Sequence, residues 1–152
     1  MQKPVVGAKA PLFSLPSTDG SIVSLKEYRG KKVVLYFYPK DDTAGCTKEA
    51  CSFRDNLARV KKKGALVFGI SADPVRAHQK FAEKYGLTFP LLSDESKEVI
   101  GAYGVWGEKA FLGKKYMGII RTTFIIDESG NIAHIFPKVK VAGHIDEVLE
   151  KL

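Results

Sequence analysis

Two uninterrupted apolar runs enclose a helical pattern, and this arrangement constrains the fold more than any other feature of the sequence. The runs are residues 32–38 and 65–71, and each has the length of a strand that is covered on both faces. Between them, apolar residues recur every three or four positions, which predicts one long amphipathic helix that ends at Gly64. The apolar positions of this helix are Ala50, Phe53, Leu57 and Val60. Strand, helix and strand in this order predict a parallel pair joined by a crossover helix.

The remaining segments extend this alternation. Residues 13–15 and 22–23 flank turn residues and predict a small hairpin, followed by one helical turn between Ser24 and Gly30. Helices are expected from Asp73-Pro74 to Tyr85, from Ser93 or Asp94 to Tyr103, and at the C-terminus over Ile145, Val148, Leu149 and Leu152. Strands are expected at residues 89–92, 119–126 and 131–136, the last two joined as a hairpin. Residues 106–118, rich in Gly and Lys, are expected to form a long loop, with Trp106 packed in the core.

This order predicts an α/β fold: a thioredoxin-like sandwich whose mixed, mainly parallel sheet is flanked by helices, with an N-terminal hairpin extension. The 152 residues fit one domain, and no linker or repeat divides them, so residues 1–152 are expected to form a single domain. With 45% apolar and 27% charged residues, the chain is not expected to be disordered.

Charge and hydropathy narrow the expected partners and location. No apolar run approaches the roughly 18 residues of a membrane helix, and the opening residues lack the apolar stretch of a signal peptide. A cytoplasmic protein with no membrane partner is therefore expected. The net charge of +7 includes two basic runs, residues 59–63 and Lys114-Lys115, but no nucleic-acid-binding motif accompanies them. We expect these runs to be solvated and predict no nucleic-acid partner.

Cys46 is the first candidate for chemistry. It follows a buried strand and a polar turn, and if Thr43 is the N-cap, Cys46 is the third residue of the helix. A thiol in the first turn meets free backbone N–H groups and the positive end of the helix dipole, which favour the nucleophilic thiolate. Cys51, five residues later, could equally line the inner face of the helix. Two cysteines do not make a disulfide framework.

Residues 36–55, YFYPKDDTAGCTKEACSFRD, carry a specific resemblance. The segment is similar to the active-site segment of the peroxiredoxins and contains their Pro-x-x-x-Thr-x-x-Cys signature. A second cysteine five residues after the first resembles the peroxiredoxin Q type, also called bacterioferritin comigratory protein. The resemblance covers almost the whole chain. Further matching segments are Ala10-Pro11, Phe13, Phe89-Pro90 and residues 103–106, 121–127 and 139–144.

The resemblance implies a thiol-dependent peroxidase that reduces hydrogen peroxide and organic hydroperoxides. Cys46 would attack the peroxide and become a sulfenic acid, and Cys51 would resolve it as an intramolecular disulfide. Thioredoxin or a similar dithiol donor would then restore both thiols. A monomer would suffice because both cysteines belong to one chain, and a weak homodimer would be compatible with this scheme.

The residue types around Cys46 fit that chemistry. The Thr43 hydroxyl and nearby backbone N–H groups can hold the peroxide oxygens, and Arg121 offers a planar fork of charged donors to the thiolate and the peroxide. Pro39 would shield the thiolate from water. No metal or organic cofactor is expected, because sulfur itself takes the two electrons. His78, His134 and His144 show no metal-ligand spacing with the cysteines, and structural or surface roles are expected for them.

Two other functions remain as alternatives. A thioredoxin-like disulfide oxidoreductase usually carries Cys-x-x-Cys, whereas this chain has Cys-x-x-x-x-Cys and also the Thr43 and Arg121 pair, which dithiol exchange does not need. A non-enzymatic basic binding module would show salt-sensitive binding to nucleic acid without either activity.

Overall fold

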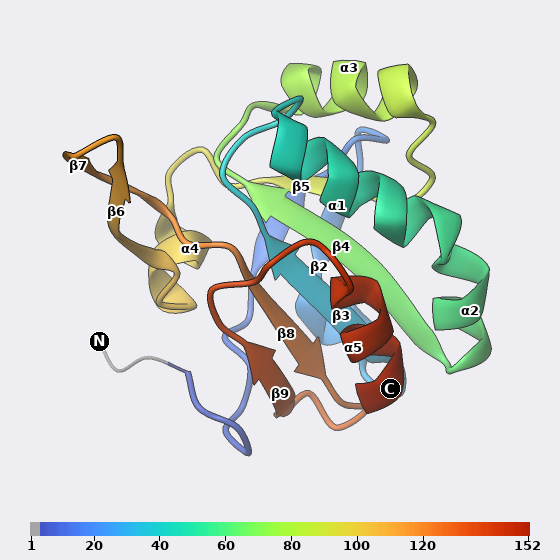
Figure 1. The fold of residues 1–152 in the computed structure, drawn as a ribbon. Helices are drawn as coiled ribbons and strands as arrows, with labels where there is room; N and C mark the ends of the chain where they lie inside the picture. Colours follow the sequence, from blue (N-terminus) through green and yellow to red (C-terminus); the bar gives the residue numbers. More distant parts are fainter. Residues whose placement is uncertain (1–3) are drawn as a thin grey trace.

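The computed structural model describes residues 4–152, so residues 1–3 of the expected single domain lie outside the described part. A five-stranded sheet forms its centre, with strand order β5-β4-β3-β8-β9 (Figure 1). The strands are β3 (Lys32–Phe37), β4 (Ala65–Ser71), β5 (Leu91–Ser93), β8 (Thr122–Ile126) and β9 (Ile132–Phe136). β3 pairs in parallel with β4 and antiparallel with β8. The expected mixed sheet is confirmed, with β4–β5 parallel and β8–β9 antiparallel.

The two faces of the sheet carry different layers (Figure 1). One face is covered by α1 (Ala44–Asp55), α2 (Leu57–Lys62), α3 (Val75–Tyr85) and α5 (His144–Lys151). The other face is covered by the predicted hairpin of β1 (Ser14–Pro16) and β2 (Ile22–Ser24), the 3-10 helix η1 (Leu25–Tyr28) and α4 (Glu98–Ala102). Alternate residues of β3 enter the two cores: Leu35 and Phe37 face the hairpin layer, and Val34 and Tyr36 face α1. The apolar run is continuous because both faces are buried.

Two expected helices are shorter than predicted. The long helix is divided at Asn56, whose side-chain amide donates to the carbonyl of Ser52 at 2.9 Å and competes with the helical backbone. The helix expected from Ser93 or Asp94 begins only at Glu98, because Lys97 has a left-handed φ of 65°. Among residues 4–152, no helix is both long enough and apolar enough to cross a membrane.

The expected loop at 106–118 is wrong. This segment is a hairpin of β6 (Trp106–Phe111) and β7 (Lys114–Ile119) that projects from the sheet (Figure 1). Its two-residue turn has φ values of 50° at Leu112 and 79° at Gly113, the backbone twist that tight hairpins favour. Trp106 is not a core residue: it is 40% exposed and lies under the Lys97 ammonium, 5.3 Å from the ring centre.

Candidate active site

The turn between β3 and α1 places Cys46 in the first helical turn. Thr43 is the N-cap residue, with an extended φ of −95° and ψ of 158°, and its carbonyl accepts the first α1 hydrogen bond from Thr47 at 2.8 Å. This confirms Cys46 as the third helical residue, among N–H groups that have no partner within the helix. The Thr43 side chain does not cap the helix, because its hydroxyl donates to the carbonyl of Lys40 at 3.0 Å. Pro39 is half-buried and opens this turn.

Arg121 meets Cys46 across the sheet. It directly precedes β8, whose first residue pairs with the last residue of β3, so the sheet brings together two residues that are 75 positions apart. One terminal nitrogen of Arg121, Nη2, donates to Cys46 Sγ at 3.3 Å, and the other, Nη1, donates to Glu49 Oε1 at 2.6 Å. The guanidinium fork therefore joins the thiol to a carboxylate one helical turn further along α1.

Burial shapes the electrostatics of this cluster. Cys46 and Glu49 are each only 1% exposed. Desolvation raises the pKa of Glu49 to about 7, although the charge of Arg121 pulls it down, and the second oxygen, Oε2, has no hydrogen-bond partner among the described residues. Burial lowers the pKa of Arg121, but attraction to Glu49 and Cys46 outweighs this and raises it. Arg121 is thus held as a cation beside the thiol.

Gly45 lets the guanidinium approach the helix closely. A Cβ added at Gly45 would lie 3.2 Å from Arg121 Nη2, closer than most side-chain carbons approach a neighbouring atom. A side chain at this position would therefore require the guanidinium that contacts Cys46 to shift by a few tenths of an ångström. The glycine before the cysteine serves the geometry of the site, at a small cost in helix propensity.

Cys51 lies further along α1, is half-buried, and is a free thiol, as is Cys46. Residues five apart on an α-helix have Cα atoms about 8.7 Å apart, from the standard rise, radius and turn. A disulfide requires a Cα separation of about 4.4–6.8 Å. The folded α1 therefore brings both cysteines to one helix but does not allow them to join.

Two of the three histidines are buried and have hydrogen-bond partners. His144 is buried and lies 2.8 Å from the Thr123 hydroxyl, and burial, with the charge of Arg121, lowers its pKa to about 4. His78 is buried and paired with Asp41. Within residues 4–152, the only His, Cys, Asp and Glu side chains grouped closely enough to hold a metal are Asp41, Asp73 and His78, and neither cysteine is among them.

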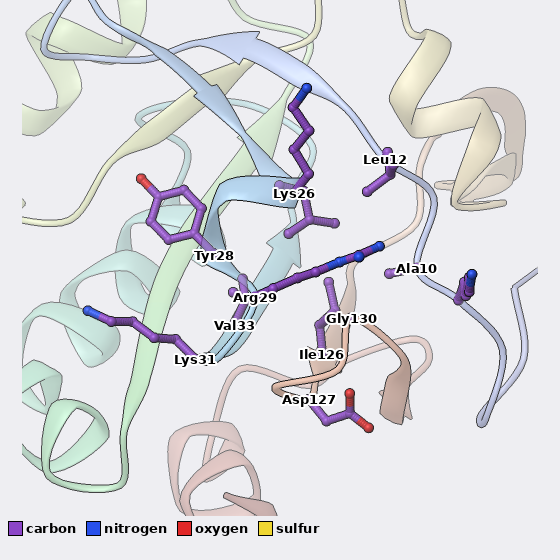
Figure 2. A pocket seen from close by; sticks show the side chains of 12 residues that line it. Ala10, Leu12, Lys26, Tyr28, Arg29, Lys31, Val33, Ile126, Asp127 and Gly130 are labelled. Carbon is purple, nitrogen blue, oxygen red and sulfur yellow. The ribbon is translucent and has the colours of Figure 1, made fainter.

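A separate cationic pocket of about 150 Å³ lies where β3 begins (Figure 2). Cys46 follows the other end of this strand. Arg29 extends across it toward Ala10, over a floor that includes Val33 and Ile126 (Figure 2). Neither cysteine lines this pocket, so it is distinct from the Cys46 cluster.

Sequence reasoning missed Glu49 as a member of the cluster. Its position three residues after Cys46 places both on one helix face, which was the available signal. Nothing in the sequence indicated that Arg121 would hold it, because that contact depends on the pairing of β3 with β8.

The chain is similar to known proteins over almost its whole length. The model of the AhpC/TSA family matches residues 6–135. A Coxiella burnetii relative is 57% identical over 147 residues, which are 97% of each chain. Peroxiredoxin Bcp of Escherichia coli is 50% identical over 146 residues, covering 96% of this chain and 94% of its own.

Solved structures show the same fold. Bacterioferritin comigratory protein of Xanthomonas campestris superposes with a TM-score of 0.88 at 37% identity, over 96% of each chain. A PrxQ variant from Xylella fastidiosa superposes with a TM-score of 0.93 at 34% identity, over 99% of this chain and 96% of its own. The matches and the cysteine-centred cluster together show that this chain belongs to the AhpC/TSA family and is a peroxiredoxin.

Proposed function

We propose that Cys46 is the residue that attacks the peroxide. Its thiolate attacks one peroxide oxygen, the O–O bond breaks, and the other oxygen leaves with a proton as water or an alcohol. Cys46 is oxidised to a sulfenic acid. The observation that carries this proposal is the 3.3 Å contact between Arg121 Nη2 and Cys46 Sγ at the start of α1. A fixed cation and free backbone N–H groups favour the thiolate over the thiol.

The neighbouring groups supply donors for the charge that develops on the leaving oxygen. Arg121 and the backbone N–H groups of the first turn are fixed before the reaction, which is what such stabilisation requires. We assign the Thr43 hydroxyl, which is exposed and belongs to the N-cap residue three positions before Cys46, to hold the peroxide oxygens. Pro39, at the opposite end of the same turn, limits the access of water to the thiolate. Sulfur takes up the two electrons, so the scheme uses no metal or organic cofactor.

Cys51 completes the cycle in this proposal. Its thiol attacks the sulfenic sulfur, water leaves, and a Cys46–Cys51 disulfide forms. Because folded α1 holds the two cysteines too far apart, the first turns of the helix must unwind for this step. Gly45 and Thr47 are weak helix formers, and opening a helix end can cost far less than global unfolding.

The thiol reductant is assigned as thioredoxin or a similar dithiol donor, which reduces the disulfide by thiol exchange. The substrates are hydrogen peroxide and organic hydroperoxides. Both cysteines belong to one chain, so a monomer can complete the cycle, and a weak homodimer is compatible with it. We also assign the chain as one catalytic domain that acts in the cytoplasm, where thiols are kept reduced.

A coupled assay tests the proposal. NADPH oxidation through thioredoxin reductase and thioredoxin is followed with hydrogen peroxide and with an organic hydroperoxide, using Cys46→Ser as the matched control. Turnover with the natural sequence and none with the control is expected. Reduction of insulin without peroxide consumption would instead identify a disulfide oxidoreductase.

A further inference from the structure

We propose that Asp41 and His78 form a latch that holds the turn before α1 in its active position. The proposal rests on the function assigned to Cys46 above and adds two positioning residues to it. Neither side chain forms a hydrogen bond with Cys46. They act through the turn, which ends in the N-cap residue Thr43 two positions after Asp41.

Each polar side-chain atom of Asp41 and His78 has a hydrogen-bond partner. His78 is 0% exposed on α3, and its Nδ1 lies 2.6 Å from Asp41 Oδ2. Its Nε2 lies 3.0 Å from the carbonyl oxygen of Leu92, which can only accept, so Nε2 carries a hydrogen. The other carboxylate oxygen, Asp41 Oδ1, accepts a hydrogen bond of 2.6 Å from the Tyr38 hydroxyl. One proton therefore lies between Asp41 Oδ2 and His78 Nδ1, in a pair shielded from water.

The backbone of the same turn is also fastened. The N–H of Asp41 donates to Asp73 Oδ2 at 2.9 Å, and that oxygen also accepts the Ser71 hydroxyl at 2.6 Å. Strand β4 and the entry to α3 thus hold the main chain, while His78 holds the side chain. Asp41 is the one residue of the turn that is held at both its backbone and its side chain in this way.

Asp42, the next residue, forms a second and weaker attachment between the turn and α3. Asp42 has a left-handed φ of 58°, and its exposed carboxylate accepts hydrogen bonds of 2.9 Å from Lys84 Nζ and from the Tyr85 hydroxyl. Exposed ion pairs contribute little, whereas removing one partner of a buried pair leaves an uncompensated polar group. The Asp41–His78 pair is therefore the stronger attachment to α3, and Asp42 is its exposed counterpart.

The consequence concerns the unwinding of α1. The disulfide step needs Cys46 to leave the helix, and each new cycle needs it to return beside Arg121. With Asp41 fastened, unwinding stops at Thr43, and the helix re-forms from an N-cap that has not moved. Loss of the latch should therefore impair the attack on peroxide, which needs the folded turn, while leaving disulfide formation, which needs the unwound turn, unchanged or faster.

Two rate constants separate these steps. Rapid acid quench with thiol alkylation and mass spectrometry measures the second-order oxidation of Cys46 by hydrogen peroxide and the first-order formation of the disulfide. Asp41→Ala is expected to slow the first by about tenfold or more, since small misplacements of reacting groups are costly. It should not slow the second. If Asp41 had only a structural role, its replacement would lower both rate constants together or neither of them.

Two further variants make the test specific. Asp41→Asn can still accept from Tyr38 and can donate its amide to His78 Nδ1, so it should keep the first rate constant within about threefold of the natural value. Tyr103→Phe removes a partly buried hydrogen bond of 2.6 Å to the carbonyl of Pro11, in the opposite core, and should change neither rate constant. If Asp41→Ala does not fold, His78→Gln supplies the same comparison, because its amide can replace only one of the two imidazole hydrogen bonds, to Asp41 and to the carbonyl of Leu92.

The outcomes are distinguishable. A natural protein that forms neither sulfenic acid nor disulfide would overturn the proposed function itself. A natural protein that forms both, with Asp41→Ala and His78→Gln leaving the two rate constants unchanged or lowering both equally, would overturn the latch alone. The double variant Asp41→Ala/His78→Gln should be no slower than Asp41→Ala, and additive losses would also contradict a shared latch.

Discussion

Cys46 and Cys51 lie five residues apart on the same helix, but they differ in burial, in position along the helix and in contact with Arg121. Cys46 is 1% exposed, lies in the first turn, and receives a hydrogen bond from Arg121. Cys51 is half-buried, lies beyond the first turn, and follows the residues that the Arg121 fork contacts. Two identical side chains thus differ chemically because of their positions along one helix and because of Arg121, which precedes strand β8. The comparison predicts which cysteine reacts first.

Removal of the nucleophile tests the comparison most severely. Cys46→Ser should abolish peroxide reduction, because no other residue combines a thiol with the helix start and Arg121. Peroxide consumption by the purified variant, measured in the thioredoxin-coupled assay, checks this. Substantial turnover would overturn the assignment of roles to the two cysteines.

Removal of the second cysteine should divide the cycle in two. Cys51→Ser should still consume one equivalent of peroxide to form the sulfenic acid, and then stall or accept an outside thiol. Sulfenic-acid trapping and mass spectrometry measure the first event, and the coupled assay measures the second. Full thioredoxin-linked turnover in this variant would remove Cys51 from the cycle.

Arg121→Lys keeps a positive charge but loses the planar fork that joins Cys46 to Glu49. We expect the second-order rate constant with peroxide to fall by about tenfold or more, because the lysine cannot donate to the thiolate and the peroxide together. That loss corresponds to at least about 1.4 kcal/mol of transition-state stabilisation. Stopped-flow kinetics measure this rate constant. A variant as fast as the natural protein would show that the fork is not needed.

The smallest expected effect is a change in stability with pH that depends on Glu49, the hydrogen-bond partner of Arg121. Its folded-state pKa of about 7 lies above the ordinary 4.5, so its contribution to stability is full below pH 4.5 and is lost as the pH rises through about 7. Glu49→Gln cannot titrate, so the natural protein should lose on the order of 1 kcal/mol relative to this variant between pH 5 and pH 7.5.

Urea unfolding at the two pH values measures the difference. His144 titrates in both proteins, so its contribution cancels in the comparison. A stability difference between the two proteins that does not change with pH would show that Glu49 is already ionised at pH 5.

The sequence predicted the elements whose burial is regular. β3 and β4 are buried on both faces, and a continuous apolar run predicts such strands. The position of Cys46 in the first helical turn could be predicted from the strand, turn and N-cap residue that precede it. The hairpin at 106–119 escaped prediction because its strands are mostly exposed, so no burial period marks them. The break at Asn56 depends on one side-chain hydrogen bond.

The parts of the site that could be predicted are those formed by residues close together in the sequence. Cys46, Thr43 and Pro39 are neighbours in the sequence, whereas Arg121 was indicated by resemblance and its contact with the thiol required the β3–β8 pairing. The contacts of Asp41 with His78 and of Glu49 with Arg121 join residues 37 and 72 positions apart. No local pattern encodes such pairs.

Amide hydrogen exchange over residues 44–51, compared between the reduced and the disulfide forms, tests most directly whether α1 must unwind. In the reduced form these amides lie in helix α1 and should exchange slowly. In the disulfide form the first turns cannot be helical, since a disulfide needs Cα atoms within about 6.8 Å and the helix holds them about 8.7 Å apart. We predict markedly faster exchange after oxidation. Exchange that oxidation leaves unchanged, with the Cys46–Cys51 disulfide verified in the same sample, would contradict the account.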